Sequence, residues 1–263
     1  MNNTLKIDNS EPVLLIDFSY YIIYRFFALQ SWFKISETVF DEDIFLTKYK
    51  ALFLSHLTKI IKKTNIKPHN VILVGDCTRS NIWRMDLFSQ YKGNRDKLQE
   101  KSPINKNIFP IIYDDIVPSL KEKGIQFVCI DKLEADDVIY HITKNISNNI
   151  TIITNDNDYL QMVKENISIV NLPSLKSITN RGLGCAKSDL LNKILCGDPS
   201  DNIPSIVGKK QATKLLKLTS EELDTYILEN DFQDKFDLNS TLIDMKNIPC
   251  ELCENIKIEI YIK

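Results

Sequence analysis

The sequence lacks three features that would each suggest a protein class: an excess of one charge, an uncharged apolar segment of membrane-spanning length, and paired metal-ligand motifs of cysteine and histidine. Its 33 basic and 35 acidic residues give a net charge of −2, so total charge does not by itself indicate a nucleic-acid partner. The most apolar run, residues 13–29, contains Asp17 and Arg25 and does not fit an uncharged membrane helix. Residues 1–12 lack the order of a secretory signal. We therefore expect a soluble, cytoplasmic protein with no membrane partner.

The six cysteines are spread along the chain without the spacing of a zinc site. Cys250 and Cys253 form one Cys-x-x-Cys pair, but no second cysteine or histidine pair lies at the spacing that zinc ligands need. Several other cysteines lie in apolar runs, where a thiol packs as a small hydrophobic group. This pattern favours a reduced intracellular setting. The apolar content of 43% is enough for one large or two modest domains with a sizeable core.

Apolar segments that alternate with amphipathic ones predict an α/β fold with a mostly parallel central sheet flanked by helices. The expected strands are residues 13–16, 71–74, 126–130, 149–154 and 167–170, and the expected helices are residues 18–29, 44–63 and 113–123. Beyond Arg181 the strand signals give way to helical ones, which predicts a second, helical region at residues 181–263. The tail at residues 256–262 fits either a strand or a helix.

Acidic residues follow the ends of these strands. Asp17 closes the first strand and Asp76 follows the second. The other candidates are Asp131, Glu134, Asp136 and Asp137 after the third strand, Asp156 and Asp158 after the fourth, and Asp198 and Asp201 in the helical region. Because ligands of such sheets bind outside the carboxyl ends of the strands, we expect these acids to converge. Crowded carboxylates repel one another, so their convergence predicts bound cations.

The chemistry of these acids predicts a divalent metal centre. Carboxylate oxygens favour Mg²⁺ or Mn²⁺ over zinc. Asp131 and Glu134 also match a helix capping box, so we expect Asp131 to be the cap and Glu134, Asp136 and Asp137 to face the metal. Two such ions would bind a phosphodiester, generate hydroxide and stabilise the leaving oxygen. No Ser-His-Asp or Cys-His arrangement competes with this interpretation.

Residues 84–106 form a basic segment, with six basic and three acidic residues. At its centre is the sequence Tyr91-Lys92-Gly93-Asn94-Arg95, in which an aromatic residue lies beside two cations. One interpretation is a solvated charged surface. The other is a loop that holds a single strand of nucleic acid, with the ring stacked on a base.

A second basic segment, residues 203–218, has four lysines and no acid. Residues 196–210 follow one expected helix and residues 211–218 resume another, which predicts a glycine-turned helical hairpin that offers backbone amides, Lys209 and Lys210 to duplex phosphates. The pair Gly208-Lys209 is not a nucleotide-binding P-loop, because Ile203 stands where that motif needs glycine.

Taken together, these motifs resemble the flap endonuclease and 5′→3′ exonuclease family, and within it the ribonuclease H branch of T-even-like bacteriophages. The matching stretches are Leu15-Ile16-Asp17-Phe18-Ser19, Trp83-Arg84, Tyr91-Lys92-Gly93-Asn94-Arg95, residues 131–137, residues 155–158, Gly197-Asp198-Pro199-Ser200-Asp201-Asn202, Leu242-Ile243-Asp244 and Ile248-Pro249. The resemblance therefore covers nearly the whole chain. It implies a nuclease domain at residues 1–180, with a basic arch at about residues 83–112, and a DNA-binding region at residues 181–263 that contains a helix-three-turn-helix.

The resemblance also implies roles for the acids. A first metal site would use Asp17, Asp76, Glu134 and Asp136, with Asp137 at or between the sites. A second site would use Asp156 and Asp158, with Asp198 and Asp201 nearby. The cofactors would be two Mg²⁺ or Mn²⁺ ions, and relatives hold K⁺ at the helix-three-turn-helix.

The basic residues take roles from the same resemblance. Lys92 would stabilise charge on the scissile phosphate, Arg84 and Arg95 would contact phosphates, and Tyr91 would stack on a base. The duplex would be held by the hairpin residues Val207, Gly208, Lys209 and Lys210. Implied partners are branched or nicked duplex DNA and RNA/DNA hybrids with a 5′ single strand, bound by a monomer. A single-strand DNA-binding protein is a further candidate partner, whereas neither end of the chain shows a clear sliding-clamp peptide.

The function expected from these features is a metal-dependent 5′ nuclease that removes RNA primers or 5′ flaps in DNA replication, in a phage-infected bacterial cell. Two alternatives stay open. A PIN-type single-strand ribonuclease would share the acidic sheet edge but need neither arch nor duplex hairpin. A catalytically silent binder of DNA structures would not need the complete acidic set.

Overall fold

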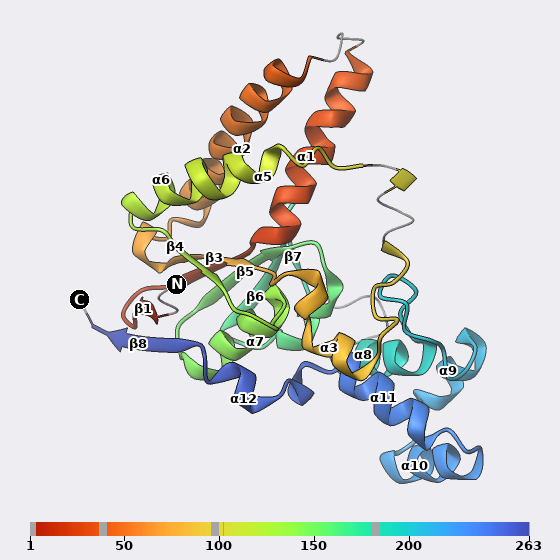
Figure 1. Cartoon of the computed structure of the whole chain (residues 1–263). Helices are drawn as coiled ribbons and strands as arrows, with labels where there is room; N and C mark the ends of the chain where they lie inside the picture. The colour runs from red at the N-terminus through yellow and green to blue at the C-terminus, as the bar shows by residue number, and fades with distance from the viewer. Residues whose placement is uncertain are drawn as a thin grey trace.

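The computed structural model describes residues 4–36, 41–95, 100–101, 103–179, 183 and 185–262. Its centre is a six-stranded sheet with the strand order β4-β3-β2-β5-β6-β7 (Figure 1). The bounds are β2 Val13–Asp17, β3 Val71–Gly75, β4 Gln126–Cys129, β5 Ile150–Thr154, β6 Ile167–Asn171 and β7 Ser177–Ile178. Only the β6 to β7 pair is antiparallel among the strand pairs of this sheet. The predicted mostly parallel α/β fold is confirmed.

Alternate residues of the central strands face two separate cores, as the pleat of a strand requires. Leu14 and Ile16 of β2 pack with α1 (Phe18–Ile35), α2 (Glu42–Thr64) and α6 (Val117–Glu122) on one face. Val13 and Leu15 pack with α7 (Ala135–Asn145) on the other face. Helices α1 and α2 run as a pair that extends well beyond the sheet (Figure 1). The continuous apolar strand sequences therefore follow from burial on both faces.

The predicted helix at residues 113–123 is not a regular α-helix throughout. The chain forms α5 (Ile108–Pro110), then one π-helical stretch, Ile111–Ile116, and then α6. Before it come η1 (Pro68–Asn70), η2 (Arg79–Asn81) and α3 (Trp83–Leu87). The predicted arch includes residues 96–99 and 102, which lie outside the described residues, so the arch stays a prediction.

The helical region contains α8 (Ala186–Cys196), α9 (Lys209–Leu215), α10 (Ser220–Glu229), α11 (Gln233–Ile243) and α12 (Cys250–Cys253). Helices α8 and α9 form the predicted hairpin, and its turn begins at Gly197, where φ is +69°. A Cβ atom there would lie 2.4 Å from the carbonyl oxygen of Ile203. Glycine is therefore required by both the backbone conformation and the close approach. The predicted division of the chain near residue 180 stays a prediction.

The two ends of the described chain form a separate parallel ribbon. Strand β1 (Thr4–Asp8) pairs with β8 (Lys257–Tyr261). The tail is therefore a strand, which decides between the two forms that its sequence allowed. The side-chain amides of Asn70 and Asn148 each donate to the carbonyl oxygen of Asp8, at 2.9 Å, and so tie the ribbon to the sheet. Among the described residues, no helix is both long and apolar enough to span a membrane.

Candidate functional site

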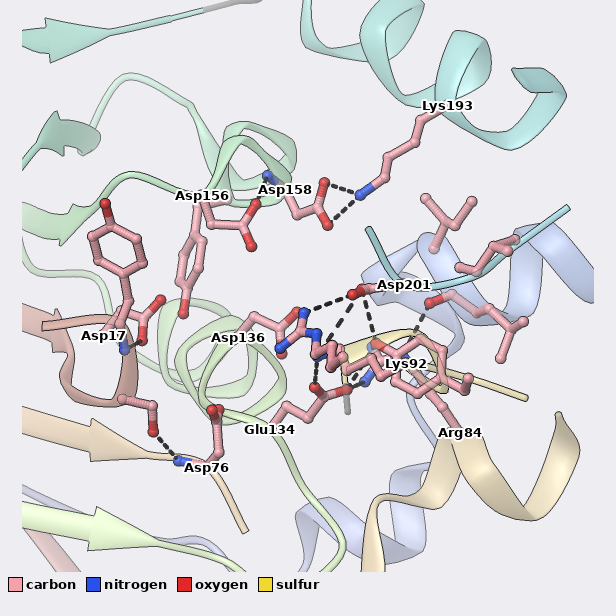
Figure 2. Close-up of a pocket in the computed structure, with 18 of the residues that line it drawn as sticks. Asp17, Asp76, Arg84, Lys92, Glu134, Asp136, Asp156, Asp158, Lys193 and Asp201 are labelled. Carbon is pink, nitrogen blue, oxygen red and sulfur yellow. Dashed lines mark hydrogen bonds and ion pairs between the residues drawn. The ribbon is translucent and has the colours of Figure 1, made fainter. Parts of the chain in front are cut away.

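The strand-end acids meet in one open cavity of about 250 Å³ at the carboxyl edge of β2, β3 and β5 (Figure 2). Its charged lining consists of Asp17, Asp76, Glu134, Asp136, Asp156, Asp158 and Asp201 with the cations Arg84, Lys92, Arg95 and Lys193. The predicted convergence of acids from distant segments is thus present. The carboxylates form two groups: those that pair with an arginine or lysine of the chain, and those that do not.

Local hydrogen bonds fix the orientation of the strand-end acids. Asp17 ends β2 and caps α1, because its Oδ1 accepts the backbone N–H of Tyr20 at 3.0 Å. Its other oxygen, Oδ2, accepts the hydroxyl of Thr154, at the end of β5, at 3.1 Å. Asp76 accepts the backbone N–H of Ala135, the first residue of α7, at 2.8 Å. Each acid is therefore held by the start of a helix or by the neighbouring strand.

We call Asp17, Asp76, Asp136 and Asp156 the unpaired wall, because no cation lies within ion-pair distance of them in the described part of the chain. Burial raises the pKa of Asp17 to about 7, and the charges of Asp76 and Asp156 add to this. Burial and Asp158 raise the pKa of Asp156 to about 6. The pKa values of Asp76 and Asp136 are also raised, first by burial. Ionisation of all four carboxylates is therefore unfavourable unless a cation binds between them.

Tyr159 adds a second sign that the unpaired wall holds a ligand. Its ring lines the cavity and is buried, yet its hydroxyl has no hydrogen-bond partner among the described residues. Buried polar atoms of this kind are usually satisfied by protein, water or an ion. Together with the all-oxygen donor set, this orphaned hydroxyl fits a hydrated divalent cation of the magnesium type.

We call the acids that have a cationic partner the paired wall: Glu134, Asp158 and Asp201 in the cavity lining, with Asp137 and Asp198 outside the lining. Arg84 is 2% exposed and binds Asp137 through two contacts, Nη2 to Oδ1 at 2.7 Å and Nη1 to Oδ2 at 2.9 Å. Its Nη1 also lies 2.9 Å from Oε2 of Glu134, which pairs with Lys92 as well. Burial opposes ionisation of Glu134, but Lys92 and Arg84 outweigh it and lower its pKa to about 2.

Asp137 does not line the cavity, although it was predicted to face the metal. It is 0% exposed, and the indole N–H of Trp83 donates to it at 3.0 Å. The expected capping role of Asp131 is wrong. Helix α7 begins after Glu134, whose backbone N–H donates to Asp137 Oδ2 at 3.1 Å, while Asp131 lies outside the helix and accepts from the Asn81 amide. The cap is therefore Glu134, one turn later than the sequence suggested.

Lys193 is a site residue that sequence reasoning missed. From α8 its ammonium donates to Oδ1 of Asp158 at 2.5 Å and pairs with Oδ2 of Asp198 at 2.6 Å, as Figure 2 shows for Asp158. Asp198 is also fixed by the hydroxyl of Ser200 at 2.6 Å. The only sequence signal was a lysine about one helical turn before Gly197, since Asp158 lies 35 residues away.

The predicted nucleic-acid-binding residues of the first basic segment bind acids of the site. Arg95 pairs with Asp201 at 2.7 Å, and the Tyr91 hydroxyl donates to Glu134 at 3.0 Å. Tyr91 is 3% exposed, so its ring has no free face for a base in this arrangement. A phosphate contact by Arg84 would likewise require it to leave Asp137. All four residues, Arg84, Tyr91, Lys92 and Arg95, line the cavity, and their roles toward a substrate stay predictions.

The hairpin residues adjoin the same site. Lys209 lines a hollow of about 300 Å³ that shares Arg95, Lys193 and Asp201 with the cavity. Lys209 and Lys210 are exposed at the start of α9, with Gly208 as its N-cap. Val207 is buried against Leu195 and Ala212, and its backbone N–H already donates to the carbonyl oxygen of Leu195 at 3.1 Å. The hairpin thus offers two exposed lysines beside the acids.

Comparison with known proteins assigns the chain to a family. Residues 12–187 match the family described as 5′-3′ exonuclease, N-terminal resolvase-like domain. The chain therefore belongs to the 5′-3′ exonuclease family, a family of nucleases, which confirms the resemblance.

Several curated relatives share this family. The 5′-3′ exonuclease of Mycoplasmopsis pulmonis is 33% identical over 217 residues, which span 79% of this chain and 66% of that protein. Ribonuclease H of Enterobacteria phage T4 is 27% identical over 271 residues, covering 95% of this chain and 86% of the phage protein. The chain spans only 24% of a DNA polymerase I of Lactococcus lactis, at 28% identity over 80% of its own length.

Solved structures agree with the fold. A 5′-exonuclease of phage T5 with bound zinc ions superposes with a TM-score of 0.67 over 94% of both chains, at 15% identity. A T5 flap endonuclease in complex with DNA and metal ions gives a TM-score of 0.58 at 15% identity, over 93% of this chain and 92% of that one. At this identity the likeness shows the fold.

Proposed function

We propose that the chain is a structure-specific 5′ nuclease that hydrolyses phosphodiester bonds with two Mg²⁺ or Mn²⁺ ions. Its role would be the removal of RNA primers or 5′ flaps during DNA replication in the cytoplasm. The observation that carries the proposal is the unpaired wall of four carboxylates facing Lys92 and Lys193 across one open cavity. The names of the relatives, a ribonuclease H and 5′-3′ exonucleases, support the same substrate class.

The residues present suit two cation positions. Asp17, Asp76, Asp136 and Glu134 would hold one ion. The second would lie toward Asp156 and Asp158, with Asp198 and Asp201 acting nearby. When bound, such ions polarise a phosphodiester and supply hydroxide for its hydrolysis.

The chain's own cations would hold the substrate. Burial disfavours the charged form of Lys92, but Glu134 and Asp201 more than compensate and raise its pKa, so the ammonium stays charged at neutral pH. A charged ammonium at the cavity wall can bind a phosphate and stabilise negative charge as it develops. Tyr91 and Arg84 would act as positioning residues, since each holds Glu134 in place.

Duplex recognition would fall to the α8–α9 hairpin. Lys209, Lys210 and the backbone amides at the start of α9 would contact phosphates without reading sequence. The hairpin would also be the place for a K⁺ ion. Its position beside the cavity favours a 5′ nuclease over a PIN-type single-strand ribonuclease, which has no use for a duplex contact.

The test is a gel assay with three substrates: a 5′-flap duplex, a duplex with an RNA primer at a nick, and free single-stranded RNA. With Mg²⁺ we expect cleavage of the first two, and none in EDTA. Asp136→Asn and Asp156→Asn should each lower the rate by about 10³-fold, or about 4 kcal/mol of transition-state stabilisation. Asp131→Asn is the matched control, because Asp131 is exposed and lies outside the cavity lining.

Three outcomes would reject the proposal. Full activity of both cavity variants would show that these carboxylates are not required. Preferential cleavage of free RNA would favour the PIN-type ribonuclease. Tight binding of the flap duplex without turnover in either Mg²⁺ or Mn²⁺ would favour a silent structure-binding protein.

A further inference from the structure

A surface groove on the α7 side of the sheet has no part in the nuclease site. It consists of two hollows of about 260 and 300 Å³ that share Tyr140, Lys144 and Lys246. Its walls come from the second half of α7, the segment after η4 (Asn157–Met162), the start of α8 and the residues between α11 and β8. Figure 1 shows α7 and α12 on this side of the molecule. The groove therefore runs across the junction between the sheet and the helical region.

The floor of the groove is apolar. Met162 and Ile167 belong to the buried core beneath one hollow, and Met245 and Ile248 lie beneath the other. Val163 and Leu190 are partly buried and line the first hollow with their side chains still accessible. An apolar floor that stays in contact with water favours binding of apolar groups from a partner.

The rim of the groove is basic. Lys144, Lys164, Lys187 and Lys246 line it and are all exposed. In the described part of the chain none of the four lies within 4.0 Å of a carboxylate oxygen. The only acids in the lining are Asp244 and Glu254. Four uncompensated ammonium groups around an apolar floor give the groove a positive potential.

Two hydrogen bonds join the segments that form the walls of the groove. The side-chain amide of Gln161 donates to the carbonyl oxygen of Ile243 at 3.0 Å. In return the backbone N–H of Met245 donates to the Gln161 carbonyl oxygen at 3.2 Å. This pair of bonds clamps the segment after α11 to the segment after β5. A preformed groove costs a partner less ordering than a mobile surface does.

We propose that this groove docks an acidic peptide segment of a partner protein, in which apolar side chains alternate with carboxylates. The carboxylates would meet the rim lysines and the apolar side chains would enter the floor. A nucleic-acid backbone complements only the rim, because it carries no apolar side chains. The groove also lacks a free aromatic face for base stacking, since Tyr140 is packed against the core and Lys144 lies 5.4 Å from its ring centroid.

The groove and the nuclease cavity lie at opposite ends of α7. Asp136 is at the start of this helix and Lys144 is eight residues further on, about 12 Å along the axis at 1.5 Å per residue. A docked peptide would therefore leave the cavity open to substrate. The groove would serve to recruit the nuclease to another protein while it works.

The test uses the full chain and a short fluorescent peptide that alternates Asp or Glu with Leu or Phe, followed by anisotropy. Lys187→Glu combined with Lys246→Glu should weaken binding at least about tenfold through charge reversal at the rim. Ala186→Glu is a second variant, which places a carboxylate in the groove at the start of α8, where a helix tolerates an acid well. Lys62→Glu combined with Lys63→Glu, in the last turn of α2, is the control with the same charge change and should bind normally.

Competition identifies the occupant. The peptide with its carboxylates replaced by amides, and the peptide with its apolar residues replaced by serine, should each bind at least about tenfold more weakly. Cleavage of the flap duplex should be unchanged in all variants, which separates this result from the nuclease assignment. Equal peptide binding by the groove variants and the control would overturn the proposal. So would displacement of the peptide by a single-stranded oligonucleotide that loses affinity in the same groove variants, because the groove would then be a nucleic-acid site.

Discussion

Both walls of the cavity consist of carboxylates, but the pKa of Glu134 on one wall and the pKa of Asp17 on the other shift in opposite directions. On the paired wall, Arg84, Lys92 and Lys193 neutralise the carboxylates, and the pKa of Glu134 falls to about 2. On the unpaired wall no cation of the described chain takes that role, and the pKa of Asp17 rises to about 7. Burial acts on both. What differs is the presence of a fixed positive charge.

This difference separates acids that the chain itself neutralises, such as Glu134 and Asp158, from acids that have no cationic partner among the described residues. A carboxylate that the chain itself neutralises contributes to stability, because its charged form is favoured in the folded state. A carboxylate left without a partner costs stability until a cation arrives. Substitutions that remove a charge on the two walls should therefore have opposite effects on the free energy of unfolding.

The largest effect is expected at Arg84. Arg84→Met should lower the free energy of unfolding by roughly 3–5 kcal/mol, because it leaves the buried Asp137 carboxylate without its partner. The variant also loses the bond from Nε to the carbonyl oxygen of Leu242 at 2.9 Å. Urea unfolding followed by circular dichroism measures the change.

The control for Arg84 is Arg95→Met. The Arg95 side chain is 48% exposed and pairs with Asp201 at 2.7 Å, so its loss should cost about 1 kcal/mol or less. Equal effects of the two substitutions would show that the Arg84 pair is no more important than a surface ion pair.

The next effect has the opposite sign. In EDTA at pH 8, Asp17→Asn should stabilise the fold by on the order of 2 kcal/mol, because a buried charge is removed. The amide can still cap α1 and still bond to Thr154, so the local structure is retained. Thermal melts of the parent and the variant between pH 4 and pH 8 measure it.

The sign follows from linkage. The pKa of Asp17 is raised in the folded state from 3.8 to about 7. Its contribution to stability is therefore fully present below about pH 4 and is lost as the pH rises through 7. The difference between parent and variant should vanish near pH 4 and should reverse when Mg²⁺ is added at pH 8. A variant that is less stable than the parent in EDTA at pH 8 would break the comparison.

The smallest effect concerns Lys193, which pairs with Asp158 and Asp198 on the paired wall. Lys193→Met should increase the affinity for Mn²⁺ about tenfold, or about 1.4 kcal/mol, because an ammonium no longer competes for Asp158 and Asp198. Isothermal titration with Mn²⁺ measures it. Lys187→Met, on the same helix but exposed and outside the cavity, is the control. A lower Mn²⁺ affinity in Lys193→Met would mean that the lysine organises the site for the ion.

The acids of the unpaired wall could be predicted from sequence because their signal is local. An apolar run followed by one acid places that acid at the carboxyl edge of a parallel strand, as at Asp17 and Asp76. The five parallel strands of the sheet and the α8–α9 hairpin were found for the same reason, whereas the two-residue strand β7 was not predicted. The first residues gave no such signal, because β1 exists only through its pairing with β8 at the other end of the chain.

The five acids of the paired wall were also candidates, but their ion pairs could not be predicted in this way. Arg84 and Tyr91 read as surface residues of a basic segment, yet both are buried against Glu134, which lies 50 and 43 residues further along. Asp158, a partner of Lys193, likewise lies 35 residues before it in the chain. Sequence patterns report which residues are charged, but only the tertiary fold decides which charges meet.

The central claim is that the unpaired wall is the cation site. The most direct measurement is an anomalous difference map from crystals soaked in Mn²⁺. We expect peaks in the cavity within bonding distance of Asp17, Asp76, Asp136 and Asp156, with Arg84 still bound to Asp137. A map with no peak in the cavity, or with a peak at Asp137 after displacement of Arg84, would contradict the account.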